Sequence, residues 1–300
     1  MSKEGKHHYI PVFYLKQWCG CDGRLCEFQK PYKLVRARRI HPDGTAYVHG
    51  LNTIAGLPPA VAQYLETQFF QIADDAAARA LRILLRPPPW NLTNDERSGW
   101  SRFLVSLAVR HPESMERHKA AARALYVKAL PEIEADYAHR KRPTDPPTYE
   151  DYAAMKGDNP AGRVAAMLIQ KVIDSELVGN HIIRMRWTVM HDARPPFLFL
   201  TSDRPLLITN GLNKRDSQLI LPISPRHVFV ATNTVETEAY IQGVMRRRQM
   251  IQQVNERVTK QSRKFVYAYD DSQFNFVSKR LGMKYTADPI EAFDFEKGLA

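Results

Sequence analysis

This chain has few cysteines, no long hydrophobic run and none of the common catalytic motifs. Three cysteines in 300 residues, and a start without an apolar signal segment, argue against a disulfide-stapled secreted protein. The best apolar runs, Phe103–Val109 and Phe197–Leu200, are far shorter than the roughly 20 residues that cross a membrane. Walker, GxGxxG, GxSxG and HExxH patterns are missing, which argues against common nucleotide-binding, serine-hydrolase and zincin classes. We therefore expect a cytoplasmic globular protein.

Positive charge is the strongest signal in the composition. The formal net charge is +11, and residues 24–39 and 240–264 carry all of this excess, because acids and bases balance elsewhere. Clustered lysine and arginine is typical of a protein with a polyanionic partner, nucleic acid first. Two solvated basic faces are the alternative. The residues expected to contact nucleic acid are Arg36, Arg38, Arg39, Arg246, Arg247, Lys260 and Arg263.

The predicted elements segregate along the chain. Apolar periodicity indicates short strands first, then several helices, then a mostly β region crossed by one long helix. Thr93 and Glu96 form a capping box for the helix that reaches Arg110. Strands are predicted at 25–29, 45–48, 184–190, 197–201, 206–209, 218–223, 228–232 and 265–269, and helices at 58–86, 93–110, 112–139, 161–180 and 235–260.

This segregation favours an α+β fold over an alternating α/β fold. We expect one domain over residues 1–270, with short N-terminal strands, a multi-helix middle and a mostly antiparallel or mixed C-terminal sheet. The proline-rich stretch 141–147 is a candidate internal linker. Residues 271–300 are expected to form a C-terminal extension.

An unusual cluster lies near the N-terminus, where two adjacent histidines precede an aromatic run (HHYIPVFYL, residues 7–15). Chain ends fray unless they are tied down. The aromatic residues can anchor this segment in a core and hold His7 and His8 near a site that other elements build. Zinc bound by Cys19, Cys21 and Cys26 with these histidines is disfavoured, because C-x-C-x4-C is not a zinc-finger spacing.

Several polar residues fall on predicted buried helix faces. Arg110 follows Leu107 by three residues. Arg248 and Asn255 lie on the apolar stripe of the 235–260 helix, which consists of Tyr240, Val244, Ile251, Val254 and Val258. Buried charges and amides are costly unless they are paired, so these side chains need partners. Structural ion pairs or snorkelling arginines are the alternative to a functional site.

Three acidic residues are the matching candidates. Glu66 precedes Phe70 by four residues on the first long helix, and Asp75 follows Ile72 by three. Asp203 follows the predicted strand 197–201, and loops at strand ends are common places for a functional site. An Asx-type turn, in which the carboxylate accepts backbone N–H groups, is the alternative for Asp203.

Together these segments resemble a bacterial family called domain of unknown function 4238. Residues 7–15 resemble its H-[HY]-[VI]-P-x-F-Y-L signature, residues 201–205 (TSDRP) its T-S-D-x-P motif, and residues 221–225 (LPISP) its P-x-S-P segment. Arg110 resembles its central arginine, Asn255 its asparagine in the last helix, and Glu66 with Asp75 its paired acids. The resemblance runs from about residue 7 to residue 269. It implies one shared constellation of His8, Arg110, Asp203 and Asn255, and no established activity.

The first hypothesis is a phosphodiesterase-type hydrolase that acts on nucleic acid, nuclease-like, with bacterial defence as one setting. His7 or His8 serves as general base or acid, because imidazole titrates near neutrality. Glu66 and Asp203 hold a divalent metal ion, Mg²⁺ or Mn²⁺. Arg110 or Arg248 stabilises charge on the phosphate, and Asn255 belongs to the same set.

The alternative hypothesis is a binding module without chemistry. The His, Asp, Arg and Asn residues then form a buried polar network that fixes the core, and the basic surface contacts nucleic acid or an acidic protein. A small-molecule enzyme, the third class, is less favoured by the charge. The deciding observation is whether His8, Glu66, Arg110 and Asp203 converge in an open cleft or are sealed in the core.

Overall fold

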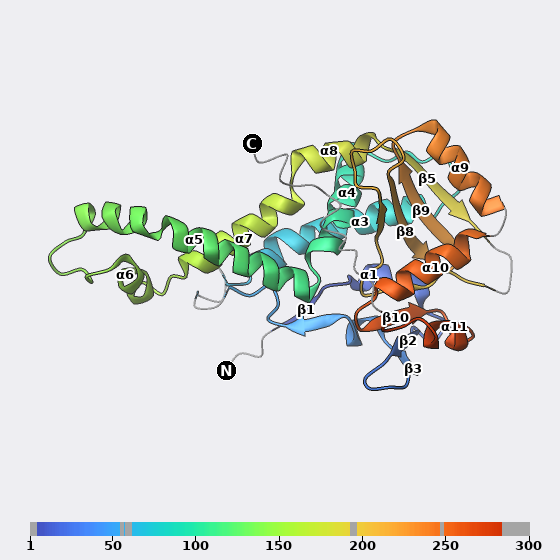
Figure 1. Ribbon diagram of the computed structural model, residues 1–300, viewed down its shortest axis with the longest axis horizontal. Coiled ribbons are helices and arrows are strands. Elements are labelled where there is room, and N and C mark those ends of the chain that lie inside the picture. Colours follow the sequence, from blue (N-terminus) through green and yellow to red (C-terminus); the bar gives the residue numbers. More distant parts are fainter. Residues whose placement is uncertain (1–4, 55–56, 58–61, 193–196, 247–248, 284–300) are drawn as a thin grey trace.

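Antiparallel sheets lie at one end of the molecule, and helices extend from them as a long arm (Figure 1). The structure, a computed structural model, describes residues 5–54, 57, 62–192, 197–246 and 249–283. Short N-terminal strands, a multi-helix middle and C-terminal antiparallel strands follow one another along the chain. The predicted α+β class is therefore confirmed.

The first sheet joins strands from both ends of the chain. Its order, within the described ranges, is β3 (Arg36–Ile40), β2 (Leu25–Gln29), β10 (Phe265–Ala268) and β6 (Thr201–Ser202). All of these pairs are antiparallel. The pattern predicts β2 with its observed bounds but not β3. The reason is that β3 lies at the edge of the sheet with its first four residues exposed, so it has no alternation of apolar and polar residues.

The predicted strand at 197–201 is much shorter in the structure, where only Thr201–Ser202 pair with β10. Phe199 and Leu200 are fully buried, which explains the apolar signal. The Asn255 side chain takes the place of a strand partner. Its Oδ1 accepts the Leu200 N–H at 2.8 Å, and its Nδ2 donates to the Leu198 carbonyl at 2.8 Å. Because the Asn255 amide satisfies the backbone groups of Leu198 and Leu200, these residues need no hydrogen bonds to a neighbouring strand.

The second sheet is covered on both faces. Among the described strands its order is β5 (Arg186–His191), β9 (His227–Thr232), β8 (Gln218–Ser224) and β7 (Leu207–Thr209), all antiparallel. Leu221 and Phe229 belong to the main core, whereas Ile220 and Val230 join a second cluster with α9 (Val235–Arg246) and α10 (Gln249–Gln261). Burial on both faces explains why β8 and β9 read as continuous apolar runs.

The predicted single helix 235–260 is divided into α9 and α10, and residues 247–248 lie outside the described residues. Val244, Ile251, Val254 and Val258 are buried as the apolar stripe predicts. The prediction is wrong for Tyr240, which is 61% exposed on α9. The buried face of α9 consists of Thr237, Ile241, Val244 and Met245, and Tyr240 lies outside it.

The middle of the chain is helical. Gly99 lets two of these helices approach closely, because a Cβ at this position would lie 2.5 Å from the Cβ of Ala76. The predicted helix 161–180 is two helices, and Ser175 caps the second by accepting the Val178 N–H. The elements are a π-helical segment η3 (Leu65–Phe70), α3 (Gln71–Leu84), α4 (Asn94–Val109), α5 (Pro112–Arg140), α6 (Tyr149–Met155), α7 (Pro160–Ile173) and α8 (Glu176–Arg184).

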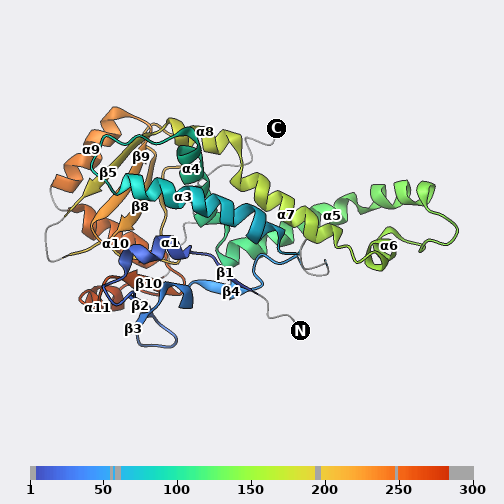
Figure 2. The same cartoon turned by 180° about the vertical axis from the view of Figure 1, so that it is seen from behind.

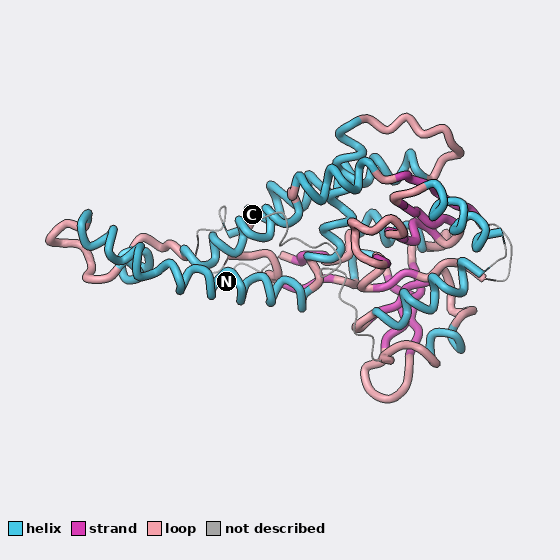
Figure 3. The backbone as a smooth tube through the Cα atoms, turned by 45° about the horizontal axis from the view of Figure 1, so that its top comes forward, coloured by secondary structure: helices cyan, strands magenta, loops and turns pink. Residues whose placement is uncertain are grey.

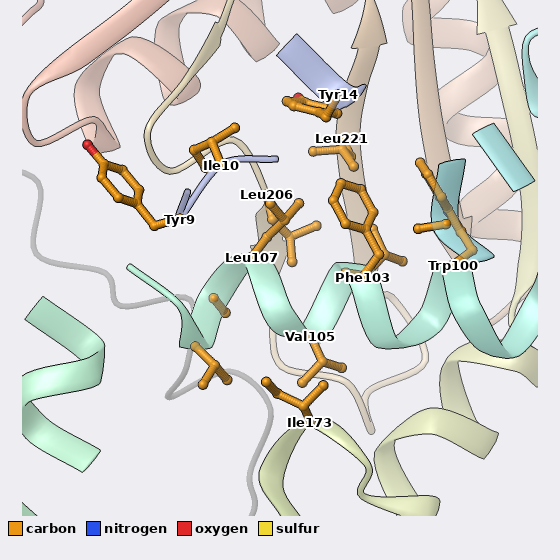
Figure 4. Packing of buried hydrophobic residues seen from close by; sticks show 14 of the residues in the cluster. Tyr9, Ile10, Tyr14, Trp100, Phe103, Val105, Leu107, Ile173, Leu206 and Leu221 are labelled. Carbon is orange, nitrogen blue, oxygen red and sulfur yellow. The ribbon is translucent and has the colours of Figure 1, made fainter. Parts of the chain in front are cut away.

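The aromatic run near the N-terminus is anchored in the core. β1 (Lys6–His8) pairs with β4 (Tyr47–His49), and the two strands lie side by side in Figure 2. α1 (Val12–Leu15) and the turns η1 (Lys16–Trp18) and η2 (Pro42–Gly44) follow. Tyr14 is fully buried, and its ring centroid lies 5.8 Å from that of Phe103 on α4 (Figure 4). Its hydroxyl donates to the Pro222 carbonyl at 2.7 Å, which ties α1 to the second sheet.

The arm consists of helices and connecting loops (Figure 3). The candidate linker 141–147 forms the connection between α5 and α6 within the arm. Residues 271–283 continue the fold, because α11 (Phe274–Ser278) and the turn after it pack Val277 and Leu281 against Cys26 and Phe28. Each helix in the described residues is too short or too polar to span a membrane.

Candidate functional site

His7 has both ring nitrogens bound within the fold. On β1 its side chain is buried, and Nδ1 accepts the Asn52 N–H at 2.9 Å. Nε2 lies 2.9 Å from Oε1 of Gln63 and donates to it, because Nδ1 is the acceptor. Gln63 in turn donates to Thr53 Oγ1 at 3.0 Å. These bonds fix the tautomer and hold β1 against the loop 51–54.

His8 lies on the opposite face of β1 and is only partly buried. Its Nε2 donates to the Asp43 carbonyl at 3.3 Å, and its ring contacts that of Tyr47, with centroids 5.6 Å apart. Burial lowers the pKa of His8, although the Asp43 carbonyl and the nearby Glu66 carboxylate raise it. His8 is therefore held toward its neutral form.

Glu66 lies in η3, and its carboxylate is bound to the loop that also binds His7. Oε2 of Glu66 accepts Nδ2 of Asn52 at 2.6 Å. Asn52 thus connects both predicted residues, since its backbone N–H binds His7 and its side chain binds Glu66. π-Helical turns are rare and are frequently found at functional sites. Sequence reasoning missed Asn52; its only signal is a polar residue in a short loop after a predicted strand.

Arg110 pairs with Asp74 on α3, the residue before the predicted Asp75. Its guanidinium binds Asp74 through two bonds, from Nη1 to Oδ2 at 3.0 Å and from Nη2 to Oδ1 at 2.9 Å. It also lies over the Phe70 ring, 4.5 Å from the centroid. Burial raises the pKa of Asp74, and the Arg110 charge opposes this. Arg110 is 2% exposed and the Asp74 side chain is 24% exposed, so this bidentate ion pair is buried at its arginine end.

Asp75 does not take this place because it lies on the exposed face of α3. The prediction treats Ile72 as part of the apolar face, but Ile72 is 62% exposed. The buried face of α3 consists of Ala73, Ala77, Ala80, Leu81 and Leu84. Alanine is less hydrophobic than isoleucine, so the alanine-rich buried face is harder to recognise in the sequence than the exposed Ile72. The pattern therefore indicates Asp75 and not Asp74.

Asp203 is sealed in the core and binds three backbone N–H groups. Oδ1 accepts Arg263 N at 2.9 Å, and Oδ2 accepts Lys264 N at 2.6 Å and Phe265 N at 3.1 Å. Burial raises the pKa of Asp203 to about 6, while the three N–H donors lower it. The carboxylate anchors the turn between α10 and β10. The local Asx-type turn expected as the alternative is not formed, because the three N–H donors lie 60 to 62 residues further along the chain.

The predicted residues therefore fall into two groups. His8, Glu66, Asp74 and Arg110 lie in one electrostatic neighbourhood around η3 and α3. Asp203 and Asn255 each organise backbone near the first sheet. Glu66 and Asp203 have separate partners and do not fit a shared metal ion. Across the described ranges, no three His, Cys, Asp or Glu side chains are grouped to hold a metal, the cysteines included.

An ion-pair group beside Asp203 was not predicted. Arg204 is 5% exposed, and its Nη2 donates to Glu113 Oε2 at 2.5 Å and to His111 Nδ1 at 3.2 Å. Arg263 donates from Nε to the same Glu113 oxygen at 3.1 Å. The group joins residues 201–205 to the start of α5. The sequence offers one indication of this group: each member except Arg263 lies within three residues of a predicted site residue, either Arg110 or Asp203.

Most of the basic residues predicted to contact nucleic acid are engaged in ion pairs. Arg38 binds Glu27 at 2.7 Å, Arg39 binds Asp22 at 2.6 Å, and Lys260 binds Glu256 at 2.6 Å. Arg36 is exposed, and no acidic partner is found for it in the described part of the chain. Arg246 ends α9, and Arg247 and Arg248 lie outside the described residues.

The described residues form an α+β fold with three antiparallel sheets. A polar network is built around the N-terminal strand of this fold. Residues 6–272 match the family described as protein of unknown function (DUF4238). The chain belongs to this family, as the resemblance predicted. No curated protein and no solved structure matches it.

Proposed function

We propose that this protein is a cytoplasmic nucleic-acid-binding module, and that the residues predicted to be catalytic are structural. The observation that carries the proposal is the hairpin formed by β2 and β3. Its loop places Tyr32, 86% exposed, and Leu34, 78% exposed, among basic side chains. We call residues 30–36 the hairpin surface; the loop projects from the first sheet (Figure 1).

The hairpin surface has unpaired positive charge. Lys30, Lys33 and Arg36 are exposed, and within the described residues none of them has an acidic partner. Unpaired cations are available to phosphates, whereas Arg38 and Arg39 would first have to leave their carboxylates. An exposed tyrosine beside such cations offers a face on which an unpaired base can stack. The combination favours single-stranded nucleic acid.

The predicted catalytic residues support the same conclusion. Both nitrogens of His7, both oxygens of Asp203 and the side-chain amide of Asn255 are bound to other parts of the fold. Arg110 is bound by Asp74. A buried network of this kind fixes the chain in one arrangement. It leaves none of these groups turned toward a phosphate.

The test is a charge reversal on the hairpin surface. We expect K30E/K33E/R36E to bind a 20-nucleotide single strand at least roughly 100-fold more weakly than wild type in fluorescence anisotropy, with a salt slope smaller by about 2–3. The matched control is R79E/R82E/K128E, which makes the same charge change on α3 and α5. Equal affinities for the two triple variants would refute the proposal.

Tyr32→Ala refines the same test. Stacking of a base on an aromatic ring is worth about 1–3 kcal/mol, so this variant should bind the single strand roughly 5- to 150-fold more weakly. Duplex DNA, whose bases are already stacked, should lose little. An equal loss for single strand and duplex would show that Tyr32 acts by shaping the loop.

A hydrolase is the second candidate, favoured by His8 and Glu66. His8 is partly exposed and held toward its neutral form, as a general base requires, and the Glu66 carboxylate is near it. The assay follows cleavage of labelled DNA and RNA with Mg²⁺ or Mn²⁺ by wild type and His8→Ala. Cleavage that His8→Ala abolishes, with oligonucleotide binding retained, would establish the hydrolase. No cleavage by the wild type would remove it.

A further inference from the structure

The described chain ends against the base of the hairpin surface. After α11, Leu281 packs into the same apolar cluster as Phe28 of β2, and Val35 of the hairpin surface packs against this cluster. A Cβ at Gly282 would lie 3.5 Å from Cδ of Lys30 and 3.8 Å from its Nζ. Figure 1 shows α11 beside β2 and β10. The residues after 283 therefore start next to the first cation of the hairpin surface.

The sequence that follows is acidic in an otherwise basic chain. Residues 285–296, which we call the acidic segment, contain no lysine or arginine, whereas the whole chain has a net charge of +11. Apolar side chains lie between the carboxylates in its second half, where residues 290–296 read IEAFDFE. The charged residues of the segment are Asp288, Glu291, Asp294 and Glu296. The acidic segment therefore has the opposite charge to the hairpin surface.

The acidic segment and the hairpin surface are complementary in two respects. Lys30, Lys33 and Arg36 have no acidic partner in the described part of the chain, so carboxylates can pair with them. Tyr32 and Leu34 lie exposed among these cations, as phenylalanine rings lie among the carboxylates of the segment. The segment is also long enough, because an extended chain spans about 3.3–3.6 Å per residue and residues 284–293 alone reach roughly 30 Å.

We propose that the acidic segment binds the hairpin surface of the same chain and competes there with nucleic acid. Its carboxylates pair with the three cations, and its phenylalanine rings pack on Tyr32 and Leu34. A short linker holds two such partners at an effective concentration on the order of mM, so individually weak contacts suffice. The competition rests on the proposed function, whereas the contact itself does not require nucleic acid.

The contact is tested by photocrosslinking in the full chain, without nucleic acid. The photoreactive residue p-benzoylphenylalanine replaces Phe293, and crosslinked peptides are identified by mass spectrometry after irradiation. We expect intramolecular crosslinks to residues 30–36. These crosslinks should largely disappear when the same chain carries K30E/K33E/R36E. They should also weaken as salt is raised, because salt screens the attraction between exposed charges.

The crosslinking control places the same photoreactive residue at Met155, which is 58% exposed on α6 in the arm. This position should give no crosslink to residues 30–36. Crosslinks from position 293 only to other parts of the chain, or to a second copy, would overturn the proposal. Crosslinks to residues 30–36 that K30E/K33E/R36E leaves unchanged would overturn it as well.

The competition is tested by removing the charge of the acidic segment in the full chain. D288N/E291Q/D294N/E296Q should bind the 20-nucleotide single strand about tenfold more tightly than wild type at low salt, as expected when the segment leaves the surface free in about a tenth of wild-type molecules. This gain should shrink as salt rises, because salt then releases the segment in the wild type too.

The matched control for this assay is D75N/E132Q/D136N/E150Q, which makes the same charge change at exposed positions. It measures the general effect of added positive charge, and its affinity should rise far less. Equal gains in the two quadruple variants, or no gain in the segment variant while the wild type binds, would overturn the competition. Crosslinks to residues 30–36 in a chain that binds no oligonucleotide would refute the proposed function alone and leave the contact established.

Discussion

The buried polar network and the hairpin surface use the same residue types in opposite ways. In the network, Arg110 is 2% exposed and held by two bonds to Asp74. On the hairpin surface, Lys30, Lys33 and Arg36 are exposed and have no acidic partner within the described residues. The network contributes to stability, since its groups are paired inside the protein. The hairpin surface contributes little to stability and leaves its charge to a ligand.

This difference shows why unusual residues in a sequence are ambiguous signs of function. Histidine, aspartate and arginine on apolar stripes are noticed because burial is costly for them. The same cost requires that they be paired, and pairing inside the fold removes them from chemistry. Exposed lysines in a loop are common and attract little notice, yet they stay available to a partner.

Loss of Arg110 should produce the largest effect. Arg110→Ala leaves the half-buried Asp74 carboxylate without its partner, so we expect the free energy of unfolding to fall by about 3 kcal/mol in urea denaturation. The double variant R110A/D74A should recover part of this loss, because no unpaired charge remains. Arg79→Ala, exposed on α3, is the control and should change stability by less than about 0.5 kcal/mol. A loss in Arg110→Ala as small as this control would mean that the pair is not structural.

Asp203→Asn should produce an intermediate effect that depends on pH. The amide presents one oxygen and one N–H₂ group to three backbone donors, which costs about 1–3 kcal/mol. In the wild type, burial raises the pKa of Asp203 from 3.8 to about 6, so the folded protein binds this proton more tightly than the unfolded chain does. The wild-type free energy of unfolding therefore falls as pH rises from about 4 to about 6.

The variant lacks this contribution, so the stability difference between wild type and Asp203→Asn should be larger at pH 4 than at pH 7. Urea denaturation at both pH values measures it. A difference that grows with pH would mean that the carboxylate is stabilised in its charged form, and the effect of burial would then be smaller than that of the three N–H donors.

The hairpin variant K30E/K33E/R36E should produce the smallest change in stability, within about 0.5 kcal/mol of wild type. Its side chains are exposed and make no ion pair in the described structure. Thermal melting of the same samples used for oligonucleotide binding provides the measurement. A much lower Tm would mean that the hairpin surface belongs to the folded core, and it would weaken any conclusion from the binding assay.

The sequence predicts those parts of the fold whose signal is local. The capping box is present as predicted, with Thr93 Oγ1 accepting the Glu96 N–H at 3.2 Å. β2 and β9 are buried strands that apolar runs identify. β3 is not identified, because an exposed edge strand needs no apolar side chain. The division of 161–180 into α7 and α8 is missed for a related reason, since Ser175 can be helical or can cap a helix.

The sequence predicts several residues of the candidate site, but it does not predict which groups they bind. Position on an apolar stripe identifies Arg110 and Asn255 as buried, and both are. It does not distinguish Asp74 from Asp75. Consecutive side chains point about 100° apart around a helix, and the apolar face predicted for α3 is not the face that is buried. Asn52 carries no periodic signal at all, although it connects His7 and Glu66.

The sequence by itself determined the fold class, the family and the location of the excess charge, because each depends on local pattern or composition. Only the tertiary structure decided that His7 binds Asn52 and Gln63, that Arg110 binds Asp74 and that Asp203 binds the turn at 263–265. These partners are 36 to 62 residues apart in the chain. A buried polar group must be paired, but the partner is whichever group the packing of helices and sheets brings within hydrogen-bond distance.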